Sequence, residues 1–170
     1  EDHTTAEIVD MLFKSWDSRS GQVREMVAHI GEPGLELILA KAQSPRTERE
    51  EQVSINLLGS CLRNASLSAK ARQAAIQRMI SLAHQHSDTD DDIRLRIMLL
   101  SFSDIKDPKT IEFVGSFTDH QIPVVQKIAK QVYASLLEAS EGEADVNAAQ
   151  EKALQKPPNS QIAPKKRGLS

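Results

Sequence analysis

The sequence predicts an all-α protein of about seven to nine helices. Apolar residues recur every three or four positions through most of the first 141 residues, a spacing that places them on one face of a helix. Hydroxyl, acidic, glycine and proline residues separate these apolar stretches, as helix starts and stops do. β-branched residues follow the same spacing, without the sustained alternation of a strand. Together these observations indicate helices joined by short turns.

Five helices are expected in the first half of the chain. Thr4 and Thr5 provide a hydroxyl cap for the first helix, and Gly31 ends the second. Pro33 suits the first turn of the third helix, where a missing N–H costs nothing. The acid-rich start of the fourth helix complements the helix dipole. The five predicted helices cover about 4–16, 23–30, 33–42, 46–63 and 66–83.

Three more helices follow, and the last two form a hairpin. The acidic turn 87–92 is expected to cap a helix over 93–102, whose apolar face consists of Ile93, Ile97, Leu100 and Phe102. Asp107–Pro108 opens a short helix, and Pro123 lies early in a longer one. Along that longer helix, an apolar stripe runs from Val125 to Leu136, which is the pattern of a core-facing helix.

The composition changes after Leu137. The segment 142–170 is expected to lie outside the helical domain as a possible short helix followed by a flexible polar and basic tail. Residues 145–156 are compatible with one more short helix, with Val146, Ala149, Ala153 and Leu154 as its weak apolar face.

The hairpin over Asp104–Leu137 resembles the HEAT and HEAT-like repeat family. In that family an Asp-Pro opens the first helix, an Asp marks the internal turn, and Val-Arg-x-x-Ala runs through the second helix. Asp107–Pro108, Asp119 and Val125…Ala129 match this pattern, whereas Gln126 replaces the family arginine. Val53, Ile93 and Val125 would begin successive second helices, at separations of 40 and 32 residues.

The resemblance implies a short right-handed solenoid of antiparallel helix pairs whose second helices line a concave, partner-binding surface. Residues 1–141 would form the domain, with 1–31 as capping helices and 32–66, 67–106 and 107–141 as pairs. The resemblance favours a non-enzymatic adaptor or scaffold that binds another protein, with no cofactor. The candidate contacts are the polar residues of the second helices: Arg49, Gln52, Asn56, Arg94, Arg96, Gln126, Lys127, Lys130 and Gln131.

No motif for catalysis is evident. The sequence has no phosphate-binding glycine loop, nucleophile elbow or zinc-binding cysteine framework. His84, His86 and Asp88 are weak candidates for a metal site, because two residues two positions apart on a helix do not share a face. The lone Cys61 lies in an apolar run and is expected to be a small buried residue. We therefore expect neither enzyme activity nor a bound metal.

Two alternatives remain open at this stage. Some HEAT-like proteins bind nucleic acid, but a net charge of −3 argues against a large nucleic-acid footprint. A HEAT-like enzyme or lyase is the second alternative, and no motif supports it.

No apolar run is long enough to cross a bilayer, so we expect a soluble protein. The chain begins with Glu1 rather than Met. Either a signal peptide has been removed or the chain has been trimmed. The compartment is thus cytoplasmic or, after loss of a leader, periplasmic or secreted.

Overall fold

The computed structural model describes residues 2–16 and 21–138, and every regular element in these ranges is a helix. This confirms the all-α prediction. The predicted tail over 142–170 lies outside the described residues. The helices are α1 Thr5–Lys14, α2 Val23–Lys41, α3 Glu48–Asn64, α4 Ala69–His86, α5 Asp92–Leu100, α6 Pro108–Gly115 and a last helix over 123–138.

Several helices start directly after a residue whose side chain caps them, close to the start that the sequence predicts. The hydroxyl of Thr4 accepts the backbone N–H of Glu7 at 3.2 Å, and the carboxylate of Glu7 accepts the backbone N–H of Thr4 at 3.3 Å. This reciprocal arrangement satisfies two backbone donors that a helix start would otherwise leave unpaired. The other side-chain caps are Thr47 for α3, Ser68 for α4, Asp91 for α5 and Asp107 for α6.

Helix α2 is bent at Gly31. The backbone of Gly31 has φ 54° and ψ −146°, a region that residues with a Cβ atom avoid. Pro33 follows in the first turn after the bend. The bend separates the two helices that the sequence predicts over 23–30 and 33–42, so the predicted break is confirmed.

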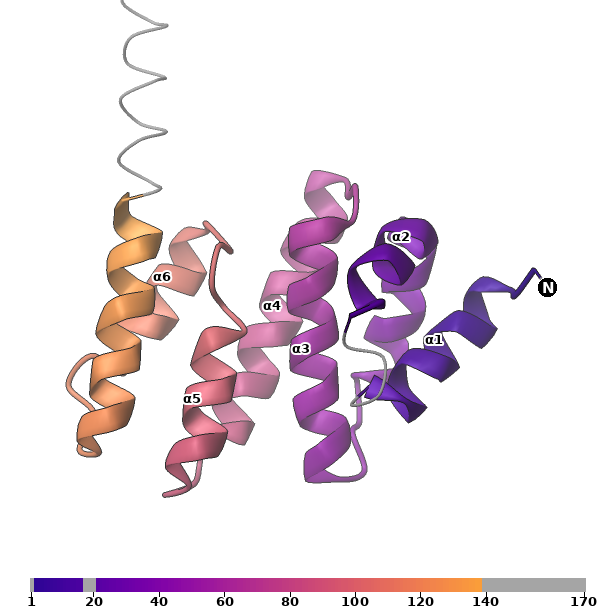
Figure 1. Cartoon of the computed structure of the whole chain (residues 1–170). Coiled ribbons are helices and arrows are strands. Elements are labelled where there is room, and N and C mark those ends of the chain that lie inside the picture. The colour runs from indigo at the N-terminus through magenta and orange to yellow at the C-terminus, as the bar shows by residue number, and fades with distance from the viewer. Residues whose placement is uncertain (1, 17–20, 139–170) are drawn as a thin grey trace, which may run out of the picture.

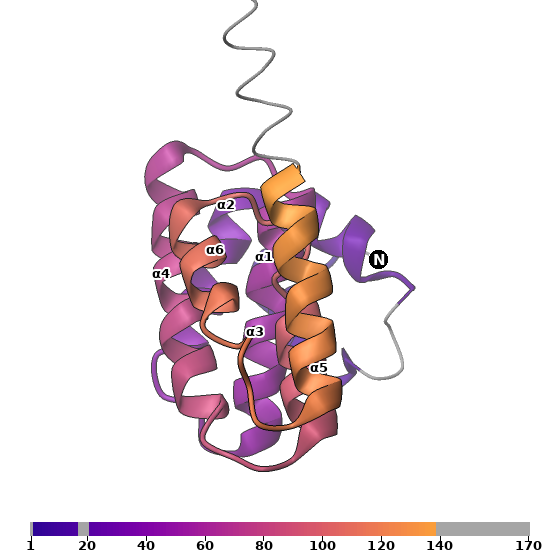
Figure 2. The same ribbon diagram turned by 90° about the vertical axis from the view of Figure 1, so that its left-hand side faces the viewer.

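The helices lie in two layers. Figures 1 and 2 show α3, α5 and the helix over 123–138 side by side in one layer, with α4 and α6 in the layer behind it. α2 contacts both α3 and α4, and α4 in turn contacts α6. α1 packs on α2 at the amino-terminal end of the stack (Figure 1). From α1 to α5, helices that are neighbours in the sequence are therefore also neighbours in space.

Helix α3 is the centre of the core. It contacts α1, α2, α4 and α5. Because neighbours surround it, α3 is buried on most sides rather than along one stripe, and Ser54 and Ser60 are buried with its apolar residues. Cys61 is fully buried here, which confirms the sequence prediction for this residue.

Among the helices of the described ranges, none is both long enough and apolar enough to cross a membrane.

Candidate partner-binding surface

The outward face of α5 is apolar. The side chains of Ile93, Ile97 and Leu100, which the sequence places on the apolar face of this helix, are 57, 38 and 50% exposed, so most of that face points to solvent. Only Phe102, beyond the end of α5, is buried among the four residues of the predicted face. α5 carries apolar residues on both sides, and the spacing alone does not say which side packs inward. The buried side of α5 consists of Leu95, Met98 and Leu99.

A groove runs along α3 beside this exposed stripe. One hollow of about 400 Å³ is lined by Trp16, Arg24, Asn56, Ser60, Arg63, Asn64, Ile97, Leu100 and Ser101. A second hollow, of about 170 Å³, is lined by Trp16, Arg49, Gln52, Val53 and Asn56. The two hollows share Trp16 and Asn56, so we treat them as one depression and call it the α3 groove. Among the described residues that line it are three arginines, Arg24, Arg49 and Arg63, and no acidic residue.

Polar contacts fix the base of the α3 groove. The guanidinium of Arg63 donates to the backbone oxygens of Ser101 at 2.8 Å and Ser103 at 3.3 Å. The hydroxyl of Ser101 also donates to the side-chain oxygen of Asn56. Burial lowers the pKa of Arg63, an effect that the nearby Asp104 carboxylate opposes. These contacts hold the end of α5 against α3, so the groove has a defined shape.

The predicted contact residues all lie on the layer formed by α3, α5 and the helix over 123–138. Three of them, Arg49, Gln52 and Asn56, line the α3 groove. The four on the last helix lie apart from it: Lys127, Lys130 and Gln131 are exposed and Gln126 is half-buried. Sequence reasoning did not include Trp16, Arg24, Ile97 and Leu100, which come from three other parts of the chain. The only property that these four residues share in the sequence is a large side chain, and a large side chain does not predict that a residue lines a binding surface.

The two predicted residues of α5 form ion pairs within the protein. Arg96 forms an ion pair with Asp92 at 3.3 Å, one turn away. The guanidinium of Arg94 lies 2.9 Å from the carboxylate of Glu48 and 3.4 Å from that of Glu51. Arg94 is therefore largely engaged between α5 and α3, whereas its proposed partner contact stays a prediction.

Arg94 belongs to a polar cluster that joins α3, α4 and α5. His86, at the end of α4, is 1% exposed, and its Nδ1 lies 2.7 Å from the Glu51 carboxylate. Arg94 Nε lies 3.1 Å from His86 Nε2. A neutral imidazole with its proton on Nδ1 satisfies both neighbours, donating to Glu51 and accepting from Arg94. Burial is the main cause that lowers the pKa of His86, and the hydrogen bond to Glu51 opposes it.

The weak metal candidates do not converge. α4 continues through His86, so His84 and His86 lie on different sides of the helix. His84 is exposed and contacts the ring of Phe113, with ring centroids 4.9 Å apart. His86 is held by Glu51 and Arg94, while Asp88 is exposed in the following turn. Across the described ranges, no group of three or more His, Cys, Asp or Glu residues is arranged to hold a metal ion.

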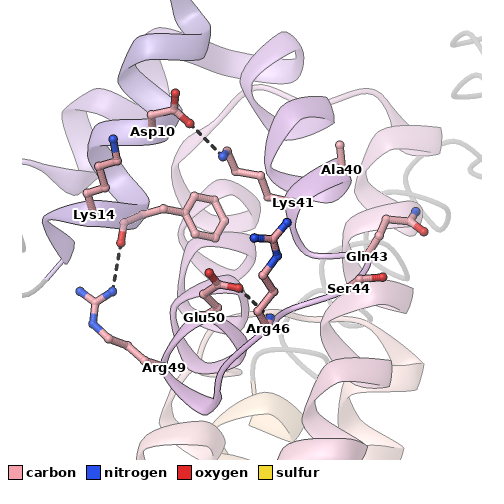
Figure 3. A pocket seen from close by; sticks show the side chains of 10 residues that line it. Asp10, Lys14, Ala40, Lys41, Gln43, Ser44, Arg46, Arg49 and Glu50 are labelled. Carbon is pink, nitrogen blue, oxygen red and sulfur yellow. Dashed lines mark hydrogen bonds and ion pairs between the residues drawn. The ribbon is translucent and has the colours of Figure 1, made fainter.

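A larger cavity, of about 580 Å³, lies between α1, the end of α2 and the start of α3 (Figure 3). Lys41 pairs with Asp10 at 2.8 Å, and this hydrogen bond is the main cause that lowers the pKa of Asp10. The Glu50 carboxylate accepts the backbone N–H of Arg46 at 2.7 Å. Both carboxylates of the cavity are thus engaged with its own basic residues. This arrangement attaches α1 to the stack and favours a structural role for the cavity.

Cys61 has no character of a nucleophile. Burial raises the pKa of its thiol to about 12, so it stays protonated at neutral pH.

Comparison of the chain with protein-family models, with curated proteins and with solved structures found no match.

Proposed function

We propose that this chain is a non-enzymatic protein-interaction module that binds a partner on the layer formed by α3, α5 and the helix over 123–138. In this proposal the two-layer stack is a short right-handed HEAT-like solenoid, and this layer is its concave side. The observation that carries the proposal is the exposed stripe of Ile93, Ile97 and Leu100 beside the α3 groove. Contiguous apolar surface on a folded protein commonly marks an interaction site.

The shape of this surface favours a macromolecular partner. The α3 groove consists of two hollows that follow α3 from Arg49 to Asn64 and are open to solvent, whereas small-molecule sites are concave cavities that enclose most of the ligand. The nine predicted polar contacts surround or extend the apolar stripe, as the polar rim of a protein interface does. A partner would thus bury the exposed side chains of α5 while contacting polar residues on both neighbouring helices.

Site-specific photo-crosslinking in the native cell or extract tests the proposal. A crosslinking amino acid is placed at Gln52 or Lys127 on the proposed face and at Gln77, an exposed residue of α4 in the opposite layer. We expect the same partner protein to be captured from Gln52 and Lys127, and not from Gln77. Capture from Gln77 alone would place the interface on the other layer and contradict the proposal.

A further inference from the structure

We propose that protonation of His86 releases the start of α5 from α3 and α4, and that this release weakens partner binding on the layer formed by α3, α5 and the helix over 123–138. The second half of this inference rests on the proposed function, because it states how binding on that layer is regulated. The first half rests on the contacts that His86 makes with Arg94 and Glu51.

The guanidinium of Arg94 lies against the imidazole of His86. Arg94 Nε is 3.1 Å from Nε2 of the ring, and Arg94 Nη2 is 3.0 Å from Nδ1. Guanidinium nitrogens only donate, so this contact needs a ring nitrogen with a free lone pair. A protonated ring has no free lone pair, and its positive charge lies directly against that of Arg94. It keeps the Glu51 carboxylate, 2.7 Å from Nδ1, and is repelled by Arg94.

The surroundings of His86 do not accommodate a second positive charge easily. The side chain is 1% exposed, so water screens the two cations little. Among the described residues, the charged groups that act on it are Glu51 and Glu48 of α3 and Arg94 of α5, while the aspartates of the turn 87–91 are exposed. Burial is the largest cause of the lowered pKa of His86; the hydrogen bond to Glu51 opposes it, and the Arg94 charge adds to it.

Arg94 attaches the start of α5 to both neighbouring helices. Besides His86 on α4, its guanidinium contacts Glu51 at 3.4 Å and Glu48 at 2.9 Å on α3. Among the first six residues of α5 only Leu95 is buried, so apolar packing holds this end weakly. The Glu48 side chain is 80% exposed, so an Arg94 that leaves His86 keeps a partner at the surface. Protonation therefore moves the start of α5 outward and leaves the rest of the stack folded.

The far end of α5 stays in place. Arg63 donates to the backbone oxygens of Ser101 and Ser103, and the Ser101 hydroxyl donates to Asn56. None of these groups changes its protonation state between about pH 5 and pH 8. α5 thus turns about its fixed end, and the residues at its start move most. They include Ile93 of the exposed apolar stripe, so the stripe loses its alignment with the α3 groove in acid.

The direction of the pH dependence follows from the two proton affinities. The attached state holds the proton of His86 less tightly than the released state, in which the imidazole regains its ordinary pKa of 6.5. The attached state is therefore fully favoured above pH 6.5, and its advantage is lost as the pH falls through 6.5 toward the lowered pKa. Partner binding on this layer should be strongest at neutral pH and weaker in acid.

Hydrogen exchange of the full chain, followed by mass spectrometry, tests the release of α5. Protection is compared at about pH 7.5 and about pH 5.5, after correction for the intrinsic exchange rate. We expect protection at the start of α5 to fall at least about threefold more than protection in α3. In His86→Gln, whose amide can donate to Glu51 and accept from Arg94 without titrating, this extra fall should disappear. His84→Gln removes an exposed imidazole from the same helix and should behave as the unsubstituted chain.

Titration of the His86 ring by NMR separates the effect of Arg94 from that of burial alone. Arg94→Gln should raise the pH at which the ring takes up its proton, and Glu51→Gln should lower it. Arg94→Gln should also reduce the loss of α5 protection in acid, because its amide can turn its oxygen toward a protonated ring. A cooperative melting transition at neutral pH establishes that each variant is folded.

The crosslinker at Gln52 tests the regulation of partner binding. We expect capture of the partner to be at least about threefold lower at about pH 5.5 than at about pH 7.5. With His86→Gln in the same chain, capture should be equal at the two pH values. A fall in capture that remains in His86→Gln originates in the partner and would overturn the regulation.

Two results of the exchange and titration measurements would overturn the release of α5. One is a loss of α5 protection in acid that persists in His86→Gln. The other is a His86 titration that Arg94→Gln leaves unchanged. Release of α5 without any change in capture would overturn the regulation. If nothing is captured from the layer at either pH, the proposed function fails, whereas the exchange data still decide whether His86 releases α5.

Discussion

Among single side chains, His86 links the stability of the protein to pH. The lowered pKa of His86 means that the folded state holds a proton less tightly than the unfolded state, whose imidazole has the ordinary pKa of 6.5. Stability is therefore greatest above pH 6.5 and falls as the pH drops through 6.5 toward the folded-state pKa. We expect the melting temperature to decrease between pH 7.5 and pH 5.5. His86→Gln, which cannot titrate, should show a smaller decrease by calorimetry; an identical decrease would contradict this role.

Thr110 is a buried side chain whose hydroxyl has no hydrogen-bond partner among the described residues. Because a buried hydroxyl without a partner loses its hydrogen bonds to water, Thr110→Val should raise the free energy of unfolding by about 1 kcal/mol. Thr118 provides the control, since its hydroxyl donates to the backbone oxygen of Gly115 at 2.7 Å. Thr118→Val should lower the free energy of unfolding by about 1 kcal/mol. Chemical denaturation measures both changes, and a loss of stability in Thr110→Val would refute the prediction.

Within single helices, Gly59 sets how closely α3 approaches the end of α5. A Cβ atom on Gly59 would lie 2.8 Å from the backbone oxygen of Ser101 and 3.0 Å from the terminal methyl of Met79. Ser101 is also held by Arg63, so the backbone has little freedom to move away. We expect Gly59→Ala to lower the free energy of unfolding by about 1–3 kcal/mol, as overpacked cores do. Gly21, where no atom of the described residues lies within 4 Å of the Cβ position, is the matched site at which alanine should be tolerated.

The helix boundaries were largely predictable because their signals are local. Thr4 with Glu7, Asp107 with Pro108, and Gly31 each act within one turn of their own helix. The orientation of α5 was not predictable, because Ile93 and Leu95 are equally apolar and only the positions of α3 and α4 decide which is covered. The α3 groove was predicted in part through Arg49, Gln52 and Asn56. Trp16 and Arg24 complete it from elements that only the fold brings together.

For the chain as a whole, stability should vary along the stack. α3 has helices on most sides, whereas α1 and the helix over 123–138 lie at the two ends (Figure 1). Opening of an end helix exposes fewer contacts than opening of the centre. We expect the slowest amide hydrogen exchange in the buried part of α3, around Leu57 and Leu58, and faster exchange in both end helices. Mass spectrometry of exchange time courses measures this profile, and uniform protection would show that the stack opens only as one unit.

The burial of α3 on most sides also has a consequence for how the protein is made. Once α1 to α3 have left the ribosome, α4 and α5 do not yet cover α3. Its residues Gly59 and Leu62, which are buried in the complete fold, are then exposed. The nascent chain then carries an uncovered apolar helix until α5 emerges, which is a state prone to aggregation. A fragment that ends between α3 and α4 should therefore be insoluble. The shortest fragment that folds should extend at least through α5.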